Sequence, residues 1–188
     1  MIKLMEGNAR YVASKLEHPD QTEERRIEVA KGQSPFAIIL TCSDSRIAPE
    51  ILFDQGLGDL FVLRTAGNVL ADVVIGSIEY AVEYLGAPLI MVLGHERCGA
   101  VSAAVDMVTK NATFPGKISS LAEAIKPAVE SVHDKGGDLI EATVTANAVM
   151  VAESLGESEP IISEALHEQH IMIVAARYDL DDGIVKLL

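Results

Sequence analysis

Short runs of apolar residues alternate along the chain with longer stretches in which apolar residues recur at helical spacing. The runs with the length of strands are residues 36–40, 60–64, 88–93 and 171–176, with residues 183–188 as a candidate edge strand. Because the four runs are continuously apolar, both faces of each strand are expected to be covered. The pattern therefore predicts an α/β fold with a mainly parallel sheet of four or five strands and helices on both faces.

The segments between these runs predict the helices, because their apolar residues recur every three or four positions. We expect helices at residues 3–15, 21–31, 49–53, 70–85, 98–109 and 160–169, and a helical stretch at 118–155 that Gly136-Gly137 interrupts. The first of these is expected to be a projecting N-terminal helix. No repeat, low-complexity tract or linker divides the chain, so we expect residues 1–188 to form a single domain.

The composition narrows the possible partners and the location. The chain carries 15 basic and 28 acidic residues, a formal net charge of −13. A surface of this sign repels nucleic acids and anionic membranes, so neither is an expected partner. No apolar run approaches the length of about 20 residues that spans a bilayer, and the N-terminus lacks the apolar core of a secretion signal. Two cysteines are too few for a disulfide framework, which favours a reducing, cytoplasmic location.

Candidate metal ligands follow two of the predicted strands. Cys42 comes just after the run 36–40, and His95 and Cys98 follow the run 88–93. In parallel sheets, sites form at the carboxyl ends of the strands. Two thiolates and an imidazole match the three protein ligands of a catalytic zinc site, which leaves a fourth position for water. Cys98 would also lie at the start of a helix, where the helix dipole stabilises a thiolate.

A simpler interpretation is that each cysteine is a small buried apolar residue and His95 a hydrogen-bonded loop histidine. The combination of all three at polar, glycine-flanked strand exits favours the metal site. A closed structural zinc site is disfavoured, because no fourth cysteine or histidine stands at ligand spacing. The remaining histidines are expected at the surface; they are His18, His133, His167 and His170.

Four motifs together resemble the β-class carbonic anhydrases. They are Cys-Ser-Asp-Ser-Arg at 42–46, Gly-Asp-Leu-Phe-Val-Leu-Arg-Thr-Ala-Gly-Asn at 58–68, Gly-Ser-Ile-Glu-Tyr-Ala-Val at 76–82 and Gly-His-Glu-Arg-Cys-Gly-Ala-Val at 94–101. The match runs in order and spacing over nearly the whole chain. The resemblance implies zinc-dependent, reversible hydration of carbon dioxide to bicarbonate and a proton. It also implies a homodimer or a dimer of dimers, with pockets at the dimer interface.

The resemblance assigns roles to individual residues. It implies zinc ligation by the three residues above, with Asp44 either completing the metal tetrahedron in a closed site or pairing with Arg46 in an open, active one. The substrate-binding residues that it implies are Gln33, which would hydrogen-bond bicarbonate, Phe61 and Tyr80, which would line the pocket, and Gly99, whose amide would face a substrate oxygen. Phe61 and Tyr80 could equally be core residues.

Two positions in the sequence depart from the family pattern. Ile39 stands where members with an inhibitory bicarbonate pocket carry tryptophan, so that regulation is not implied although Arg64 is present. Glu96-Arg97 replaces the usual small or neutral residues between the ligands His95 and Cys98.

One alternative function is hydrolysis of a sulfur analogue, such as carbonyl sulfide, on the same scaffold. The other is a non-catalytic zinc- or bicarbonate-binding protein, against which the Asp44–Arg46 pair argues.

Overall fold

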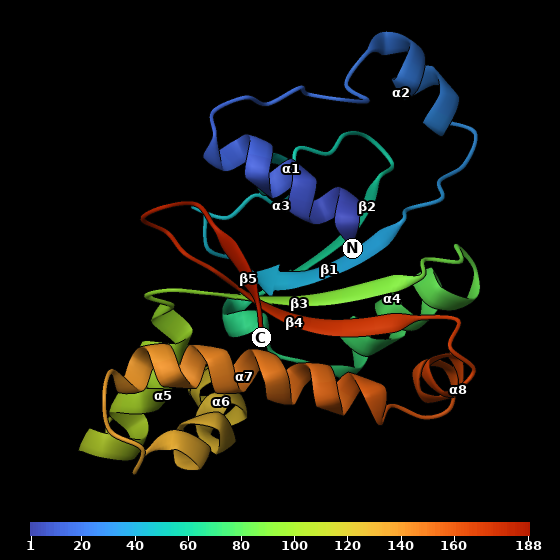
Figure 1. Ribbon diagram of the computed structural model, residues 1–188. Coiled ribbons are helices and arrows are strands. Elements are labelled where there is room, and N and C mark those ends of the chain that lie inside the picture. The colour runs from blue at the N-terminus through green and yellow to red at the C-terminus, as the bar shows by residue number, and fades with distance from the viewer.

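The computed structural model describes residues 1–188, and its centre is a five-stranded sheet (Figure 1). The strands are β1 (Ala37–Cys42), β2 (Leu60–Thr65), β3 (Leu89–His95), β4 (Met172–Tyr178) and β5 (Val185–Leu187). They lie in the order β2-β1-β3-β4-β5, in which the first four positions are parallel and β5 runs antiparallel to β4. Every residue of β1 and β3 is buried, which explains their continuous apolar runs. The predicted α/β fold with a mainly parallel sheet is confirmed.

Helices cover both faces of this sheet. They are α1 (Ile2–Val12), α2 (Glu23–Val29), α3 (Pro49–Leu52), α4 (Asp72–Glu83), α5 (Gly99–Lys110), α6 (Ile118–Val132), α7 (Leu139–Gly156) and α8 (Ile161–His167), and a short 3-10 helix, η1 (Ala66–Asn68), follows β2. In Figure 1, α1 and α3 lie above the sheet and α7 and α8 below it, while α5 and α6 pack beside α7. α4 shares its buried core with α7 and α8, so it covers the same face as they do. The predicted break at Gly136-Gly137 is confirmed, with φ of 72° and 83° between α6 and α7. None of the helices combines the length and the apolarity needed to cross a membrane.

The core is divided in two by the sheet, because successive residues of a strand point to opposite faces. Ile39 and Met91 belong to the half under α1 and α3, which continues to α5 and α6. Ile38 and Ile90 belong to the half formed with α4, α7 and α8. Burying a side chain of this size contributes about 1.5–3 kcal/mol, so both faces hold the central strands firmly in place.

The central strands continue beyond the apolar runs that predicted them. The runs 36–40 and 88–93 end before the candidate ligands, yet Cys42 pairs with Thr65 of β2 and His95 pairs with Tyr178 of β4. Backbone pairing needs no apolar side chain, so both strands extend two residues further than predicted. Cys42 and His95 are therefore the last residues of rigid strands and not loop residues.

Asn8 of α1 ties the two ends of the chain together. Its Nδ2 donates to the carbonyl oxygens of Leu52 and Gly183 at 3.2 and 2.9 Å, and its Oδ1 accepts from the Val185 amide at 2.9 Å. The side chain is buried, so these hydrogen bonds form away from competing water. The N-terminal helix is thereby fixed to α3 and to the start of β5.

Candidate metal centre

Three potential metal ligands converge where β1 and β3 end. The sulfurs of Cys42 and Cys98 lie 4.0 Å apart, and these two atoms and a ring nitrogen of His95 all lie within 4.8 Å of one another. β1 and β3 are neighbours in the sheet, so their last residues meet, and Cys98 adds the third ligand as the residue that precedes α5. All three side chains are buried. The structure therefore brings the three predicted metal ligands together where β1 and β3 end.

The ring of His95 is oriented for metal binding. Its Nδ1 lies 2.8 Å from the carbonyl oxygen of Glu96, which assigns the proton to Nδ1 and leaves the Nε2 lone pair free. Nε2 is buried without a hydrogen-bond partner. A buried polar atom without a partner is costly, and a cation between Nε2 and the two sulfurs would satisfy it. The three residues therefore fit a metal ion.

The two sulfurs are close enough to share a proton. The hydrogen bond with Cys98 lowers the pKa of Cys42 to about 4, and the Gly67 amide, which donates to the Cys42 sulfur at 3.3 Å, acts in the same direction. The same hydrogen bond, together with burial, raises the pKa of Cys98. One thiolate therefore forms readily, and a bound cation would stabilise the second.

Asp44 and Arg46 form a paired carboxylate and guanidinium beside this cluster. Arg46 donates from Nε to Oδ1 at 2.9 Å and from the second guanidinium nitrogen to Oδ2 at 2.7 Å, and its amide also donates to Oδ1. These hydrogen bonds hold the pKa of Asp44 well below its usual range, so the carboxylate is ionised at neutral pH. Oδ2 of Asp44 lies 4.0 Å from Nε2 of His95. An ionised acceptor is thus held at the edge of the ligand cluster and is turned toward Arg46.

Sequence reasoning missed two groups that support the centre. Arg64 donates to the carbonyl oxygens of Cys42 and Asp44 at 3.2 and 2.7 Å, which fixes the chain as it leaves β1. The Gly67 amide reaches the Cys42 sulfur from η1, where φ is +69° and an added Cβ would lie 2.6 Å from Ile125. The signal for Arg64 was its strand register, because it pairs with Thr41 beside the first ligand. The signal for Gly67 was its place in the Ala-Gly-Asn turn that directly follows β2.

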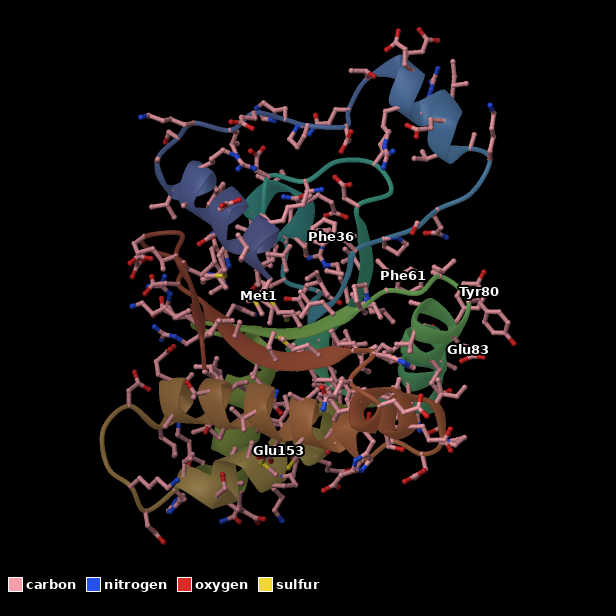
Figure 2. All side chains as sticks on the ribbon, turned by 45° about the vertical axis from the view of Figure 1, so that its right-hand side comes forward. Met1, Phe36, Phe61, Tyr80, Glu83 and Glu153 are labelled. Carbon is pink, nitrogen blue, oxygen red and sulfur yellow. The ribbon has the colours of Figure 1, made fainter.

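The predicted substrate-binding residues fall into two groups. Gly99 is the first residue of α5 and adjoins Cys98, so it lies at the centre. Gln33 precedes β1, and a strand of this length places the start of β1 about 17 Å from Cys42 at roughly 3.3 Å per residue. Phe61 pairs with Ile38, also near the start of β1, and packs partly against the core under α4. Tyr80 lies half-exposed in the last turn of α4, and Figure 2 shows it at the edge of the molecule. Within one chain, Gln33, Phe61 and Tyr80 therefore do not meet the ligand cluster.

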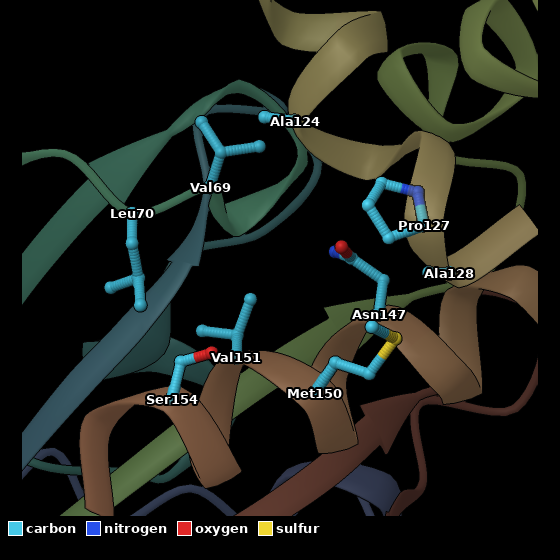
Figure 3. A pocket seen from close by; sticks show the side chains of 9 residues that line it. All are labelled: Val69, Leu70, Ala124, Pro127, Ala128, Asn147, Met150, Val151 and Ser154. Carbon is cyan, nitrogen blue, oxygen red and sulfur yellow. The ribbon is translucent and has the colours of Figure 1, made fainter. Parts of the chain in front are cut away.

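A separate cavity lies behind η1, between α6 and α7 (Figure 3). It measures about 210 Å³, and its lining is mostly apolar: Val69, Leu70, Ala124, Pro127, Ala128, Asn147, Met150, Val151 and Ser154. Asn147 donates from Nδ2 to the Gly67 carbonyl oxygen at 3.0 Å and so secures the turn whose amide reaches Cys42. None of the ligand residues lines this cavity, so it is distinct from the metal centre.

Comparisons with known proteins agree with this geometry. The carbonic anhydrase family model matches residues 37–185. Carbonic anhydrase 2 of Mycobacterium tuberculosis (strain H37Rv) is 42% identical over 180 residues, which cover 96% of this chain and 87% of the relative. The β-carbonic anhydrase CafA of Aspergillus fumigatus is 27% identical, with a TM-score of 0.76 over 96% of this chain and 86% of that one. A tetrameric β-carbonic anhydrase from Sordaria macrospora, 24% identical, shares the fold with a TM-score of 0.80 over 96% of this chain and 90% of that one.

The family match extends through all the elements that carry the ligand cluster, from the first residue of β1 to the first residue of β5. The chain therefore belongs to the β class of the carbonic anhydrase family, the lyases that reversibly hydrate carbon dioxide to bicarbonate and a proton.

Proposed function

We propose that this chain hydrates carbon dioxide on a zinc ion held by Cys42, His95 and Cys98, with Asp44 and Arg46 as its catalytic pair. The observation that carries the proposal is the buried Nε2 of His95, which has no partner and belongs to a cluster with two sulfurs. Two thiolates and an imidazole are ligands that zinc prefers, and the two thiolate charges balance the charge of the ion. When bound, zinc supplies the Lewis acidity that makes water a nucleophile near neutral pH.

Asp44 orients the nucleophile in this proposal. Its ionised Oδ2, 4.0 Å from Nε2 of His95, is placed to accept a hydrogen bond from the attacking oxygen and to direct a lone pair of that oxygen at carbon dioxide. Arg46 keeps the carboxylate ionised and turned away from the metal ligands. This is the open arrangement of the pair, in which Asp44 acts on the substrate side and not as a fourth ligand.

The Gly99 amide stabilises the negative charge that develops as bicarbonate forms. As the first residue of α5 it has an amide without a partner inside the helix, and the positive end of the helix dipole favours an anion there. The amide is therefore suited to donate to the oxygen that becomes negative as bicarbonate forms. No side chain at position 99 would obstruct that approach, because glycine has none.

A second copy of the chain completes the pocket. Gln33, Phe61 and Tyr80 lie near the amino ends of the strands, so we assign them to the site of a neighbouring subunit in a homodimer or a dimer of dimers. The exposed apolar side chains of α4 and of Tyr84, which follows it, support this assignment, since Val73, Tyr80 and Tyr84 are 79%, 49% and 75% exposed in the single chain. The β-carbonic anhydrases of Sordaria macrospora are tetrameric. We also propose that residues 1–188 form one domain and that the thiolates serve in the reducing cytoplasm.

The test combines metal analysis with a hydration assay. Metal-free protein is titrated with zinc while stopped-flow indicator measurements follow carbon dioxide hydration. We expect activity to rise in proportion to zinc and to reach its plateau at about one equivalent per chain. Uptake of zinc without hydration activity would leave a binding protein only, and selective activity on carbonyl sulfide would favour the hydrolase. A chain that takes up no zinc would overturn the ligand assignment.

A further inference from the structure

The loop that joins His95 to Cys98 contains a residue in an unfavourable backbone conformation. Arg97 has φ of +51°, a left-handed conformation that is uncommon for residues with a side chain. Glu96 is the other residue of this loop, and its amide donates to the Tyr178 carbonyl oxygen at 3.1 Å. Contacts from outside the loop must therefore hold Arg97 in this conformation, since the residue itself does not favour it.

Glu141, in the first turn of α7, supplies such a contact. Its Oε1 accepts from the Arg97 amide at 3.2 Å, and its Oε2 accepts from the guanidinium of Arg177 at 2.6 Å. Arg177 lies on β4, opposite Gly94 in the sheet register, and also donates to Glu96 at 3.1 Å. The side chains of Glu141 and Arg177 are 26% and 20% exposed, so the contacts are largely shielded from water. A rigid helix and a rigid strand therefore fix the carboxylate against the loop amide.

The geometry points to Glu141 as a positioning residue of the metal centre, one that holds the Arg97 amide and thereby sets the spacing between His95 and Cys98. This inference rests on the proposed role of these two residues as zinc ligands. Arg97 stands between them, so a change of its backbone dihedrals would move the imidazole relative to the sulfur. Residues that orient metal ligands from outside the ligand set commonly change metal affinity by about 10- to 100-fold.

The side chain of Arg97 provides a matched comparison. It forms a two-point contact with Asp181, at 3.0 and 2.8 Å. Removal of the Asp181 carboxylate therefore takes a hydrogen-bonding group from the side chain of Arg97, whereas removal of the Glu141 carboxylate takes one from its main chain. Only the second change is expected to alter the backbone that separates the two ligands.

The experiment measures zinc transfer from the loaded protein to a chromogenic chelator and the visible absorption spectrum of the cobalt(II)-substituted protein. Glu141→Ala is expected to speed zinc transfer by at least about tenfold and to shift the cobalt ligand-field bands. Glu141→Gln should lie between this variant and wild type, because its amide oxygen can still accept from the Arg97 amide. Asp181→Ala should match the wild type in both measurements.

Rescue by glycine separates positioning from a general loss of stability. Arg97→Gly adopts a positive φ readily, so the double variant Glu141→Ala/Arg97→Gly should return zinc transfer and the cobalt spectrum toward wild type. If Glu141→Ala is poorly folded, the comparison of Glu141→Gln with wild type decides the question. Wild-type zinc transfer and cobalt bands in the folded Glu141 variants, or no rescue by glycine, would overturn the inference. Failure of the proposed function is distinct, because the wild-type protein itself would then bind no zinc or hydrate no carbon dioxide.

Discussion

The carboxyl and amino ends of the parallel sheet differ in how much of the proposed site a single chain builds. At the carboxyl ends, the ligand side chains are buried, and Asp44 is held by two guanidinium hydrogen bonds from Arg46. At the amino ends, Gln33 and Tyr80 are exposed, and the ring of Tyr80 lies beside that of Tyr84, with 5.4 Å between the ring centroids. One chain thus builds a rigid ligand cluster but leaves the side chains of Gln33 and Tyr80 on an open surface. Changes at the first end should act within a chain, and changes at the second should act between chains.

Cys98→Ser is expected to have the largest effect, because it removes one of only two thiolates. Serine is a poor zinc ligand, so the variant should lose most of its zinc and with it nearly all hydration activity. Elemental analysis and stopped-flow hydration on the same preparation measure both quantities. Ser45→Ala, an exposed change nearby, is the control and should retain both. Wild-type zinc content in Cys98→Ser would mean that the ligand set is wrong.

Arg46→Ala should separate metal binding from turnover at the same end of the sheet. Without the guanidinium, Asp44 loses the hydrogen bonds that hold it away from the ligands, and the metal becomes its nearest positive charge. We expect full zinc content, an unchanged thermal midpoint within a few degrees and loss of most hydration activity at pH 7. A surface ion pair without a catalytic role would change stability by about 1 kcal/mol or less and would leave turnover near wild type. Near-normal turnover with full zinc would remove the pair from the mechanism.

Tyr80→Ala tests the open end, and its effect should be smaller than that of either change above. The variant should keep its zinc and lose part of its activity, whereas Tyr80→Phe, which keeps the ring, should stay close to wild type. Mixing Tyr80→Ala with Cys98→Ser, after unfolding and refolding together, gives a sharper result. If Tyr80 of each subunit serves the site of its partner, each mixed dimer contains one intact site, and activity should exceed the summed background of the two variants by about a quarter of the activity that Tyr80→Ala loses. No gain on mixing would place Tyr80 outside the neighbouring site.

Asp54→Asn should leave both ends of the sheet unchanged and affect stability alone. Burial raises the pKa of Asp54, but hydrogen bonds from the Glu17 amide, the Arg10 guanidinium and the His18 amide outweigh it and hold the pKa below its ordinary value. A depressed folded-state pKa stabilises the fold above about pH 4 and loses that contribution as the pH falls. The free energy of unfolding of the variant should therefore be about 1.5–3 kcal/mol lower than that of the wild type at pH 7, with a smaller difference at pH 3.5.

Chemical denaturation of the metal-free, reduced protein at the two pH values measures the effect of Asp54→Asn. Glu17→Ala, which removes only an exposed carboxylate 3.8 Å from Arg10, is the control and should show little difference at either pH. An equal loss at both pH values would contradict the link to the ionised Asp54. Zinc content and turnover of the loaded protein should match wild type.

The sequence predicted the fold and the ligand cluster because both depend on local patterns. Continuous apolar runs located the strands, and polar residues at the exits of two adjacent strands located Cys42, His95 and Cys98. The strand ends were placed two residues too early, because the pairing of Cys42 with Thr65 and of His95 with Tyr178 leaves no apolar trace in the sequence. The roles of Asp44, Arg46 and Gly99 came from the family resemblance and stay predictions.

Long-range contacts could not be predicted from the pattern. The contact between Glu141 and the Arg97 amide joins residues 44 positions apart, and nothing near either residue indicates the other. Arg64, which reaches back 22 and 20 positions to the carbonyl oxygens of Cys42 and Asp44, differs in that the register of β2 against β1 places it beside the first ligand. For Gln33 and Tyr80 the difficulty is of another kind, since a motif gives the role of a residue but not the subunit in which it acts.

The hydrogen bonds of Asn8 have a consequence for the order in which the molecule can be assembled during synthesis. Asn8 leaves the ribosome well before two of its partners, Gly183 and Val185, which lie 175 and 177 positions later. α1 is thus made long before the contacts that lock it in place can form, and contacts of such sequence separation slow folding. Until then, the apolar side of α1, including Leu4, lacks its final cover and is open to non-native association. A truncation that removes the last few residues would prolong this exposed stage, although it takes away none of the metal ligands.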